Sequence, residues 1–303
     1  MNNIDKESGR YYLSWLIKGV SVKELEVTTR IGDLDKFEDA ESLRMIERLI
    51  KDTKLSPPSQ RWLFKCAVAQ KKHKVIKLYI RQGFDTSNEI EFDFYETNHD
   101  VRPMILMCQT PPLISAMQVE TYEFKTIKFL VDQGCRLDSY GVFYFGGQNY
   151  FQTNTVGAAV YFKRPEVLKY LLEKLSESGQ LKSQLNFKTI KKEWIFGNDA
   201  RLLPYFFDGF TPLMMLFFDV FHQMPSLSVI APKTRLQMCK LLIEYGADQS
   251  PTTLLGDTVF HLAASKCKDQ EVNEFLFKNC NIDLDTRNNL GMTPLDICKK
   301  LDK

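Results

Sequence analysis

The 303-residue sequence lacks an excess of charge of either sign. It contains 40 Lys and Arg against 38 Asp and Glu, which gives a formal net charge of +2. Because a strong field of one sign attracts nucleic acid or an acidic membrane, the near balance argues against both as partners. Long apolar runs are also missing: the strongest, 212–221, is short and includes Asp219, and the start MNNIDKESGR is polar. We therefore expect no membrane insertion and no export signal.

Paired cysteines and catalytic signatures are missing as well. The seven cysteines are odd in number, scattered along the chain, and form no CxxC pair. This pattern indicates reduced thiols in an intracellular core, in the cytoplasm or nucleus, and not a disulfide framework or a zinc site. The four histidines show no metal-like spacing, and the sequence has no HExxH, GxSxG or P-loop motif and no GxGxxG after a strand. We therefore expect a protein that is not an enzyme and uses neither a cofactor nor a metal.

What the sequence does contain is a repeated phrase. GDTVFHLAA (256–264) is followed, 35 residues later, by GMTPLDICK (291–299), and DGFTPL (208–213) opens in the same way. A second phrase follows each full copy, as in MCKLLIEYGAD (238–248) and VNEFLFKNCNID (272–283). Thr followed by Pro favours a helix start, because Thr caps exposed N–H groups and Pro lacks the N–H that would stay unpaired there. The sequence therefore predicts helix pairs that recur and stack.

The pairing of a TPLHxAA-like start with a VxxLLxxGAD-like end resembles the ankyrin repeat family. The resemblance covers about residues 59–303 and is closest in the two C-terminal units. It implies an all-α solenoid of stacked helix-turn-helix units with elongated β-hairpin or loop insertions. The alternative is an irregular helical bundle in which the TPL phrases recur by chance. The implied units, five full and one partial, lie near 59–85, 110–138, 153–175, 208–248, 256–285 and 289–303.

The first 58 residues do not match the repeat. Arg10 to Val20 and Glu41 to Lys51 carry helical apolar spacing, and Ser56-Pro-Pro-Ser59 then interrupts the chain. We expect a helical N-terminal cap at 1–58, because the end of a stack must present a polar outer face. The alternative is a docking module that recruits a ubiquitin ligase, although no F-box or SOCS-box pattern is present.

His261 occupies the histidine position of the TPLH-like phrase. In ankyrin proteins this histidine usually hydrogen-bonds the backbone of the neighbouring unit, so the resemblance implies a structural role. Ligand binding or acid–base work is the alternative. Gly134 and Gly246 fall where second helices end, a position that favours left-handed backbone. Cys280 takes the glycine's place in the fifth unit, where we expect a less regular helix end.

Four long segments interrupt the repeat. Residues 86–109 mix acids with aromatics, 139–153 place six aromatics among glycines without a charge, 176–207 combine KTIKKEW with LLPYFF, and 219–234 lie inside a unit. In ankyrin proteins the hairpin fingers and the inner helices line a concave binding surface, while loops between paired helices emerge elsewhere. Aromatic residues are enriched where interfaces carry most of the binding energy. The candidate partner contacts are Phe92, Phe94, Tyr95, Tyr140, Phe143, Tyr144, Phe145, Tyr150, Phe151 and Trp194.

Two alternatives apply to these segments. Alternating aromatics, as at Phe143 and Phe145, are also typical of β-hairpins that pack one face on the helices. The basic clusters at 71–74 and at Lys188, Lys191 and Lys192 are either solvated surface or patches that steer a complementary partner.

The sequence thus predicts a non-catalytic scaffold or adaptor that binds a protein partner through the concave face and the aromatic fingers. The first alternative is a regulatory or inhibitory subunit of an enzyme. An RNA-associated factor and a ubiquitin-ligase substrate adaptor are further alternatives.

Overall fold

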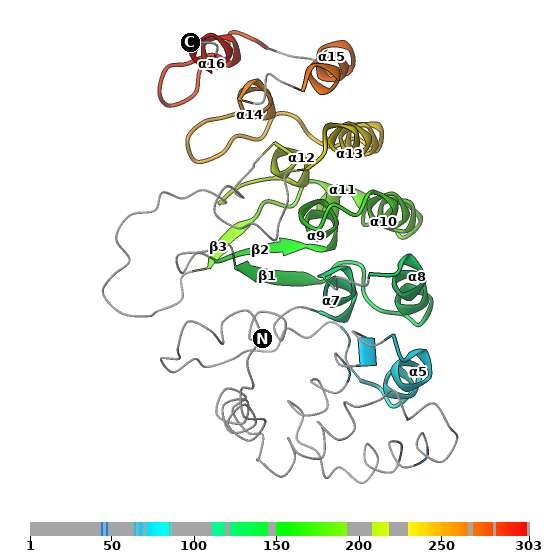
Figure 1. Cartoon of the computed structure of the whole chain (residues 1–303). Coiled ribbons are helices and arrows are strands. Elements are labelled where there is room, and N and C mark those ends of the chain that lie inside the picture. The colour runs from blue at the N-terminus through cyan, green and yellow to red at the C-terminus, as the bar shows by residue number, and fades with distance from the viewer. Residues whose placement is uncertain are drawn as a thin grey trace, which may run out of the picture. The chain divides into compact units, whose positions relative to one another are not determined.

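The computed structural model describes residues 64, 67–68, 71–84, 86, 111–118, 122–144, 150–192, 208–217, 230–265, 269–280 and 283–301, with positions 44 and 47. Across these residues the chain is mostly helical, as predicted, and contains one small sheet (Figure 1). It divides into two compact units, 1–141 and 142–303. Of the predicted cap at 1–58, only Arg44 and Glu47 are described, and both are helical. Its boundary stays a prediction.

The first unit contains the helices α5 (His73–Arg81), α7 (Pro112–Gln118) and α8 (Phe124–Asp132), of which α7 packs against α8. Before α5 the chain makes a tight turn, in which Lys72 N–H donates to the Ala67 carbonyl at 2.8 Å. Ala67 and Val68 before this turn are helical and buried, so a helix pair precedes α7. Gly134 follows α8 at φ 88°, in the left-handed region that its position predicts.

The second unit contains most of the described helices, and they form two rows (Figure 1). In one row α10, α13 and α15 pack in succession; in the other α9, α12, α14 and α16 do so. Apart from the short helix that follows α10 (Leu181–Leu185), successive helices alternate between the rows, so the chain moves along both rows together. Their bounds are α9 (Thr155–Tyr161), α10 (Pro165–Glu177), α12 (Pro212–Met215), α13 (Pro232–Glu244), α14 (Val259–Ala264), α15 (Gln270–Asn279) and α16 (Pro294–Leu301).

Helix starts in this unit follow the repeated phrase. The side chains of Thr211 and Thr258 accept hydrogen bonds from the N–H groups of Met214 and His261, and Pro212 occupies the first turn of α12. After α13, Gly246 has φ 87°, as predicted, whereas α15 ends at Cys280 with φ −118° and ψ 145°. The expected irregular end of α15 is therefore confirmed.

The sheet joins two insertions that are distant in sequence. Strands β1 (Tyr140–Tyr144), β2 (Tyr150–Asn154) and β3 (Ile190–Lys192) lie in the order β1-β2-β3. β3 runs antiparallel to β2, with Phe151 opposite Lys191 and Gln152 opposite Ile190. The hairpin of the second insertion was predicted, but its pairing with the basic segment of the third insertion was not.

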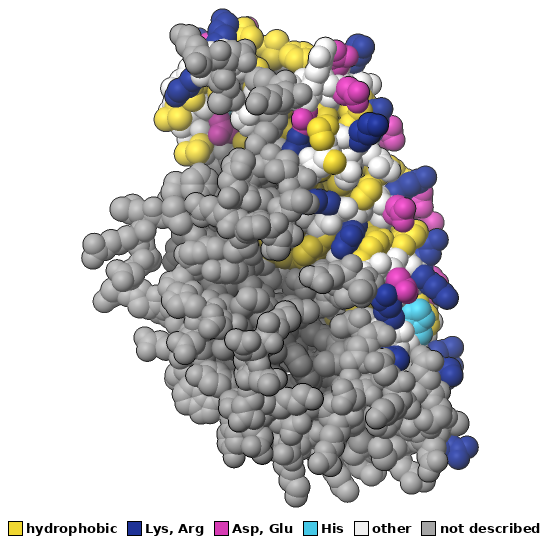
Figure 2. Space-filling model, in the orientation of Figure 1, with side chains coloured by type: hydrophobic (Ala, Val, Ile, Leu, Met, Phe, Trp, Pro, Cys, Tyr) yellow, Lys and Arg dark blue, Asp and Glu magenta, His cyan; other side chains and the backbone are white. Residues whose placement is uncertain are grey.

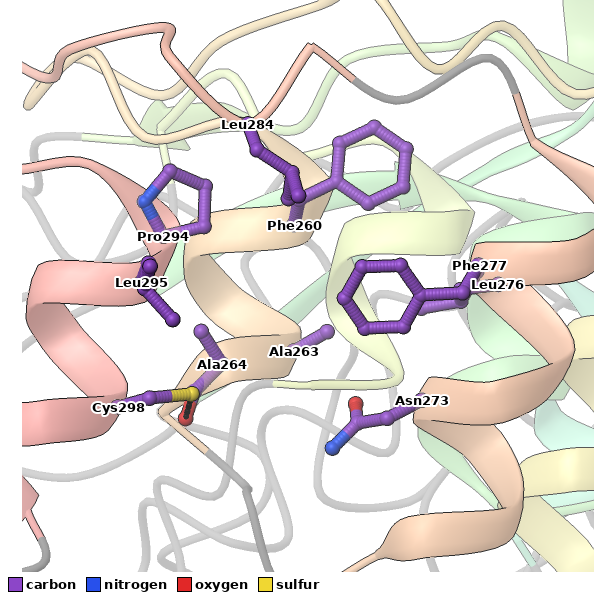
Figure 3. A pocket seen from close by; sticks show the side chains of 10 residues that line it. All are labelled: Phe260, Ala263, Ala264, Asn273, Leu276, Phe277, Leu284, Pro294, Leu295 and Cys298. Carbon is purple, nitrogen blue, oxygen red and sulfur yellow. Dashed lines mark hydrogen bonds between the residues drawn. The ribbon is translucent and has the colours of Figure 1, made fainter.

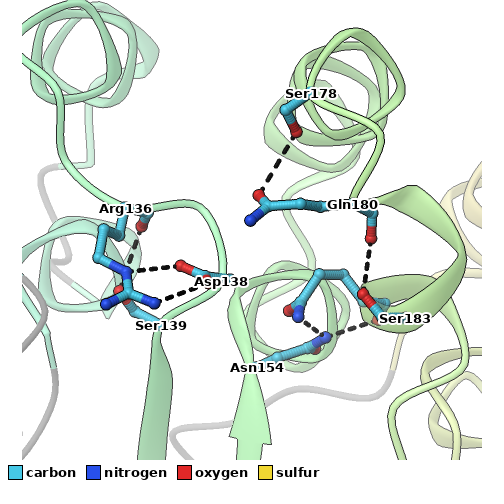
Figure 4. Close-up of polar contacts among 8 residues, drawn as sticks. Arg136, Asp138, Ser139, Asn154, Ser178, Gln180 and Ser183 are labelled. Carbon is cyan, nitrogen blue, oxygen red and sulfur yellow. Dashed lines mark hydrogen bonds and ion pairs between the residues drawn. The ribbon is translucent and has the colours of Figure 1, made fainter.

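Asn154 connects the end of β2 to α9 and to the short helix α11 (Leu181–Leu185) (Figure 4). Its Oδ1 accepts a hydrogen bond from Gly157 N–H at 2.8 Å, which caps α9. Its Nδ2 donates to the carbonyl and to Oε1 of Gln184, at 2.6 and 3.0 Å. The side chain is fully buried, and both its oxygen and its nitrogen are paired, as a buried amide requires.

Gly157 has to be glycine because α9 begins so close to the sheet. A Cβ at this position would lie 2.0 Å from Oγ1 of Thr153, which is itself fully buried. The preceding strand and the helix can therefore approach each other only without a side chain here.

A buried arginine connects three helices of the second unit. Arg235 in α13 is 2% exposed; its Nε donates to the Leu216 carbonyl after α12 at 2.9 Å. Its Nη1 forms an ion pair with Asp269, the residue that precedes α15. Since a buried charge is costly unless it is paired, this contact fixes how α13 meets both neighbours.

The described cysteines are free thiols, as predicted. Burial raises the pKa of Cys135 and of Cys239 to about 12.

None of the described helices combines the length and the apolar character that crossing a membrane requires.

Candidate partner-binding surface

Two of the aromatic residues that were predicted to contact a partner are instead buried in the hairpin. Phe143 and Phe151 are 2% and 0% exposed, and their rings stack with centroids 5.4 Å apart. Both rings also contact Tyr161 of α9, at 5.1 and 5.5 Å. These two side chains fit the packing alternative, in which one face of the hairpin lies on the helices.

The other predicted aromatics are less fully described. Tyr140 is partly exposed, and Tyr144 and Tyr150 lie in β1 and β2, where the structure describes only their backbone. The remaining predicted contacts lie outside the described residues: Phe92, Phe94, Tyr95, Phe145 and Trp194.

The first basic cluster is tied to α8. Lys71 forms an ion pair with Glu123 at 2.9 Å, and its hydrogen bond to the carboxylate lowers the pKa of Glu123. The ring of His73 stacks on Phe129 at 4.4 Å, and its Nε2 lies 3.2 Å from Oγ1 of Thr126. At least two members of this cluster therefore hold helices together.

The second basic cluster lies partly on the sheet. Lys188 is exposed, and Lys191 and Lys192 lie in β3. Their place opposite β2 puts them beside the aromatic hairpin in the same sheet.

Two linkers of the second unit make the same tight turn, at 253–256 and at 288–291; we call these the finger turns. In the first, Thr253 N–H donates to the Asp257 carbonyl and Gly256 N–H to the Thr253 carbonyl, both at 2.9 Å. In the second, Asn288 and Gly291 repeat this pattern at 2.9 and 2.8 Å. Both glycines have positive φ, 75° and 74°, which the turn requires.

The two finger turns are hydrogen-bonded to each other. Asn289 donates from its backbone N–H to the Leu255 carbonyl and from Nδ2 to the Leu254 carbonyl, both at 2.9 Å. Asn288 Nδ2 donates to Oδ1 of Asp257 at 2.7 Å. The approach is so close that a Cβ on Gly256 would lie 2.6 Å from Oδ1 of Asn289. The backbone of both turns is therefore held in one arrangement.

Three leucines project from these turns into solvent. Leu254, Leu255 and Leu290 are 50%, 49% and 69% exposed; we call them the finger leucines. In Figure 2, hydrophobic side chains lie at the edge of the C-terminal elements, where the linkers before α14 and α16 run. Large apolar side chains that cluster on a fixed backbone are typical of interaction sites.

The sequence interpretation missed these leucines, although a signal was present. TTLLGD and NNLG place leucine inside a tight turn, between residues that favour such turns. A side chain in such a turn at the surface has little chance of being buried.

The bases of the same linkers form a polar groove of about 500 Å³. Its walls include Asp248 and Asp283, and Phe260 lies among its lining residues. A hydrogen bond from the Ser250 backbone lowers the pKa of Asp248, and one from the Thr286 side chain lowers that of Asp283. Both carboxylates are thus ionised near neutral pH.

The two linkers that border the groove are acidic. The linker residues 247–258 and 283–293 contain four aspartates and one basic residue, Arg287. Arg287 Nη1 donates to the Gly291 carbonyl, which holds this charge within its own turn. Among the described residues no group of three or more His, Cys, Asp or Glu could hold a metal ion.

His261 links α14 to the following linker. Its Nδ1 accepts the Thr258 N–H at 3.2 Å, and Nε2 lies 3.0 Å from the Met292 carbonyl. Since a backbone N–H can only donate and a carbonyl can only accept, the ring carries its hydrogen on Nε2. The predicted bond from His261 to neighbouring backbone is therefore confirmed.

In comparisons with known proteins, no family model matches this chain and no curated protein matches its sequence.

Proposed function

We propose that the chain is a non-catalytic scaffold of the ankyrin type that binds a protein partner. Two features support the repeat architecture: the helices of the second unit pack in two rows, and successive linkers make the same turn. His261 also contacts the linker before α16, the first helix of the next unit, as the ankyrin resemblance implies. Function in a repeat scaffold depends on the surface that its linkers present.

The exposure of the finger leucines on a fixed backbone carries the proposal. Each leucine that a partner covers contributes up to about 2 kcal/mol from burial of apolar area. Because the two turns are already hydrogen-bonded together, binding orders little additional backbone, and more of this energy remains as affinity. The finger leucines therefore form an apolar contact that is arranged before the partner arrives.

The acidic groove favours a partner segment that carries positive charge. Asp248 and Asp283 lie at the bases of the linkers that carry the leucines. A segment with apolar side chains and nearby Lys or Arg residues would complement both parts of this surface. The aromatic residues of the first insertion, and those of the second insertion other than the buried Phe143 and Phe151, are proposed separately as partner contacts.

The experiment compares two variants in affinity purification from a matched lysate. Leu254→Ser, Leu255→Ser and Leu290→Ser are combined in one protein, and Lys169→Ser serves as the control. The Lys169 side chain is 63% exposed on α10 and belongs to neither the finger turns nor the sheet. Both variants are first checked for a melting temperature within a few degrees of wild type.

The proposal expects a partner that the wild type and the control retain and the triple variant loses. An identical set of proteins on all three baits would contradict binding through the finger turns. A partner enzyme whose turnover falls on binding would instead support the regulatory-subunit alternative.

A further inference from the structure

A small apolar cavity lies between α14, α15 and α16, apart from the finger turns but sharing Phe260 with the polar groove (Figure 3). Its volume is about 90 Å³. Phe260 and Ala264 from α14, Phe277 from α15, and Leu295 and Cys298 from α16 line it. Ligand sites of ordinary size are several times larger, so the cavity is suited to one apolar side chain and not to a cofactor.

The cavity opens on a face of α15 that no described residue fully covers. Aligning the second phrases of the repeat, Cys239 and Ile243 of α13 correspond to Asn273 and Phe277 of α15. Cys239 is fully buried and Ile243 partly buried in α13, against which α15 packs, whereas Phe277 is 59% exposed. The position of Ile243, which α15 shields in α13, is therefore exposed in α15, where Phe277 occupies it.

Neighbouring side chains extend this apolar area. Leu295 of α16 is 53% exposed, and Leu284 in the linker between the two helices is 39% exposed. We call Phe277, Leu284 and Leu295, together with the cavity they border, the C-terminal face. This face therefore carries both projecting apolar side chains and an apolar cavity.

The charges around this face are self-complementary. In α15, Glu271 and Glu274 precede Lys278, and all three side chains are exposed. In α16, Asp296 lies in the first turn and Lys299 and Lys300 in the last. Each helix is therefore acidic where it begins and basic where it ends. An antiparallel copy of the same helices would bring the acidic half of each against the basic half of the other.

We propose that the C-terminal face binds the same face of a second copy of this chain, with the two α15 helices antiparallel. A two-fold interface uses one patch on both partners, so it needs a surface that carries both the projecting side chain and the hole. The exposed Phe277 and the cavity at its base meet that requirement. The net charge of +2 adds little repulsion between two copies. The proposal is independent of the finger turns and of the partner that they bind.

Sedimentation velocity of the full chain over a range of protein concentrations tests the proposal. We expect a monomer–dimer equilibrium in the wild type. Phe277→Asp places a charge in the contact and should raise the dimer dissociation constant at least about tenfold. Ile190→Asp, which also charges an exposed apolar residue, should leave the constant unchanged. Circular dichroism and thermal melting establish that both variants are folded; if Phe277→Asp is not, Leu295→Asp replaces it.

A charge exchange tests the antiparallel arrangement. Glu274→Lys and Lys278→Glu each place like charges together in a homodimer, and each should weaken self-association about fivefold or more. Mixing the two variants restores opposite charges at both ends, so the mixture should dimerise as well as the wild type. A wild type that stays monomeric throughout overturns the proposal. So does a dimer that Phe277→Asp and Leu295→Asp leave intact, or a mixture that remains as weak as its components.

Discussion

His261 in α14 donates a hydrogen bond from Nε2 to the backbone carbonyl of Met292, 31 residues further along the chain, at 3.0 Å. Its other ring nitrogen accepts the backbone N–H of Thr258, at the start of its own helix. One side chain that is 1% exposed therefore closes its own helix start and fixes the next linker.

Replacing His261 tests this double role. His261→Leu keeps an apolar side chain of similar size but leaves the Thr258 N–H and the Met292 carbonyl without this partner. We expect a loss of about 1–3 kcal/mol in the free energy of unfolding. Urea denaturation measures it, with Ser265→Ala at the end of the same helix as the control. A loss no greater than the control's would contradict a structural role for the histidine.

Asn154 offers a similar test at the joint between β2, α9 and α11. Asn154→Asp keeps the oxygen that caps α9 but replaces the nitrogen that donates to Gln184. We expect Asn154→Ala and Asn154→Asp both to lower stability, by about 1–3 kcal/mol for the alanine variant. Thermal unfolding of the two variants compares them. If Asn154→Asp unfolds at the wild-type temperature, the contacts to Gln184 add no stability.

The buried Arg235 and its partly exposed partner Asp269 should be strongly coupled. Asp269→Ala leaves the buried guanidinium without its counterpart and should cost about 3–5 kcal/mol, whereas Arg235→Met leaves a carboxylate that is 13% exposed and should cost less. The double variant should be more stable than the sum of the single effects predicts, because neither charge then remains buried alone. Chemical denaturation of the four proteins in this cycle gives the coupling energy. Additive losses would show that the two side chains act independently.

Asp296 should contribute to the acid sensitivity of the chain. The Thr293 backbone N–H donates to its carboxylate at 3.0 Å, and this bond is the main cause that lowers the pKa of Asp296 below its ordinary 3.8. Since the folded-state pKa lies below the unfolded one, the stabilisation is complete above pH 3.8 and is lost as the pH falls through the folded pKa.

Asp296→Asn keeps an oxygen that can accept the Thr293 bond but removes the titration. We expect its stability to change less than that of the wild type between neutral pH and pH 3. Thermal melting at a series of pH values measures the difference. Parallel pH profiles for the two proteins would contradict a role for this carboxylate.

Features set by short stretches of chain were predictable from the sequence. Thr211 and Thr258 cap helices because a hydroxyl directly before a helix start reaches the N–H three residues later. Gly134 and Gly246 adopt left-handed backbone because the chain must leave its helix there. These helix caps and helix ends depend on a few adjacent residues, so the repeated phrases are sufficient to predict them.

Features that depend on distant segments were not predictable in the same way. The pairing of Phe151 with Lys191 joins two insertions with no shared pattern, and no spacing rule indicates that Gln184 will meet Asn154. The aromatic content of 139–153 suggested an interface, but burial of Phe143 against Tyr161 is decided by the packing of the hairpin on α9. The finger leucines were not predicted because the arrangement that exposes them depends on hydrogen bonds between two turns that are distant in sequence.

Two backbone N–H groups in the finger turns report on how firmly the turns are held, through their rates of hydrogen exchange. The Gly256 N–H is bonded inside its own turn, so its exchange with solvent deuterium requires only that this turn open. The Asn289 N–H is bonded to Leu255 on the other turn, so its exchange requires the two linkers to separate. The ratio of these two exchange rates therefore distinguishes the opening of one finger turn from the separation of the two linkers.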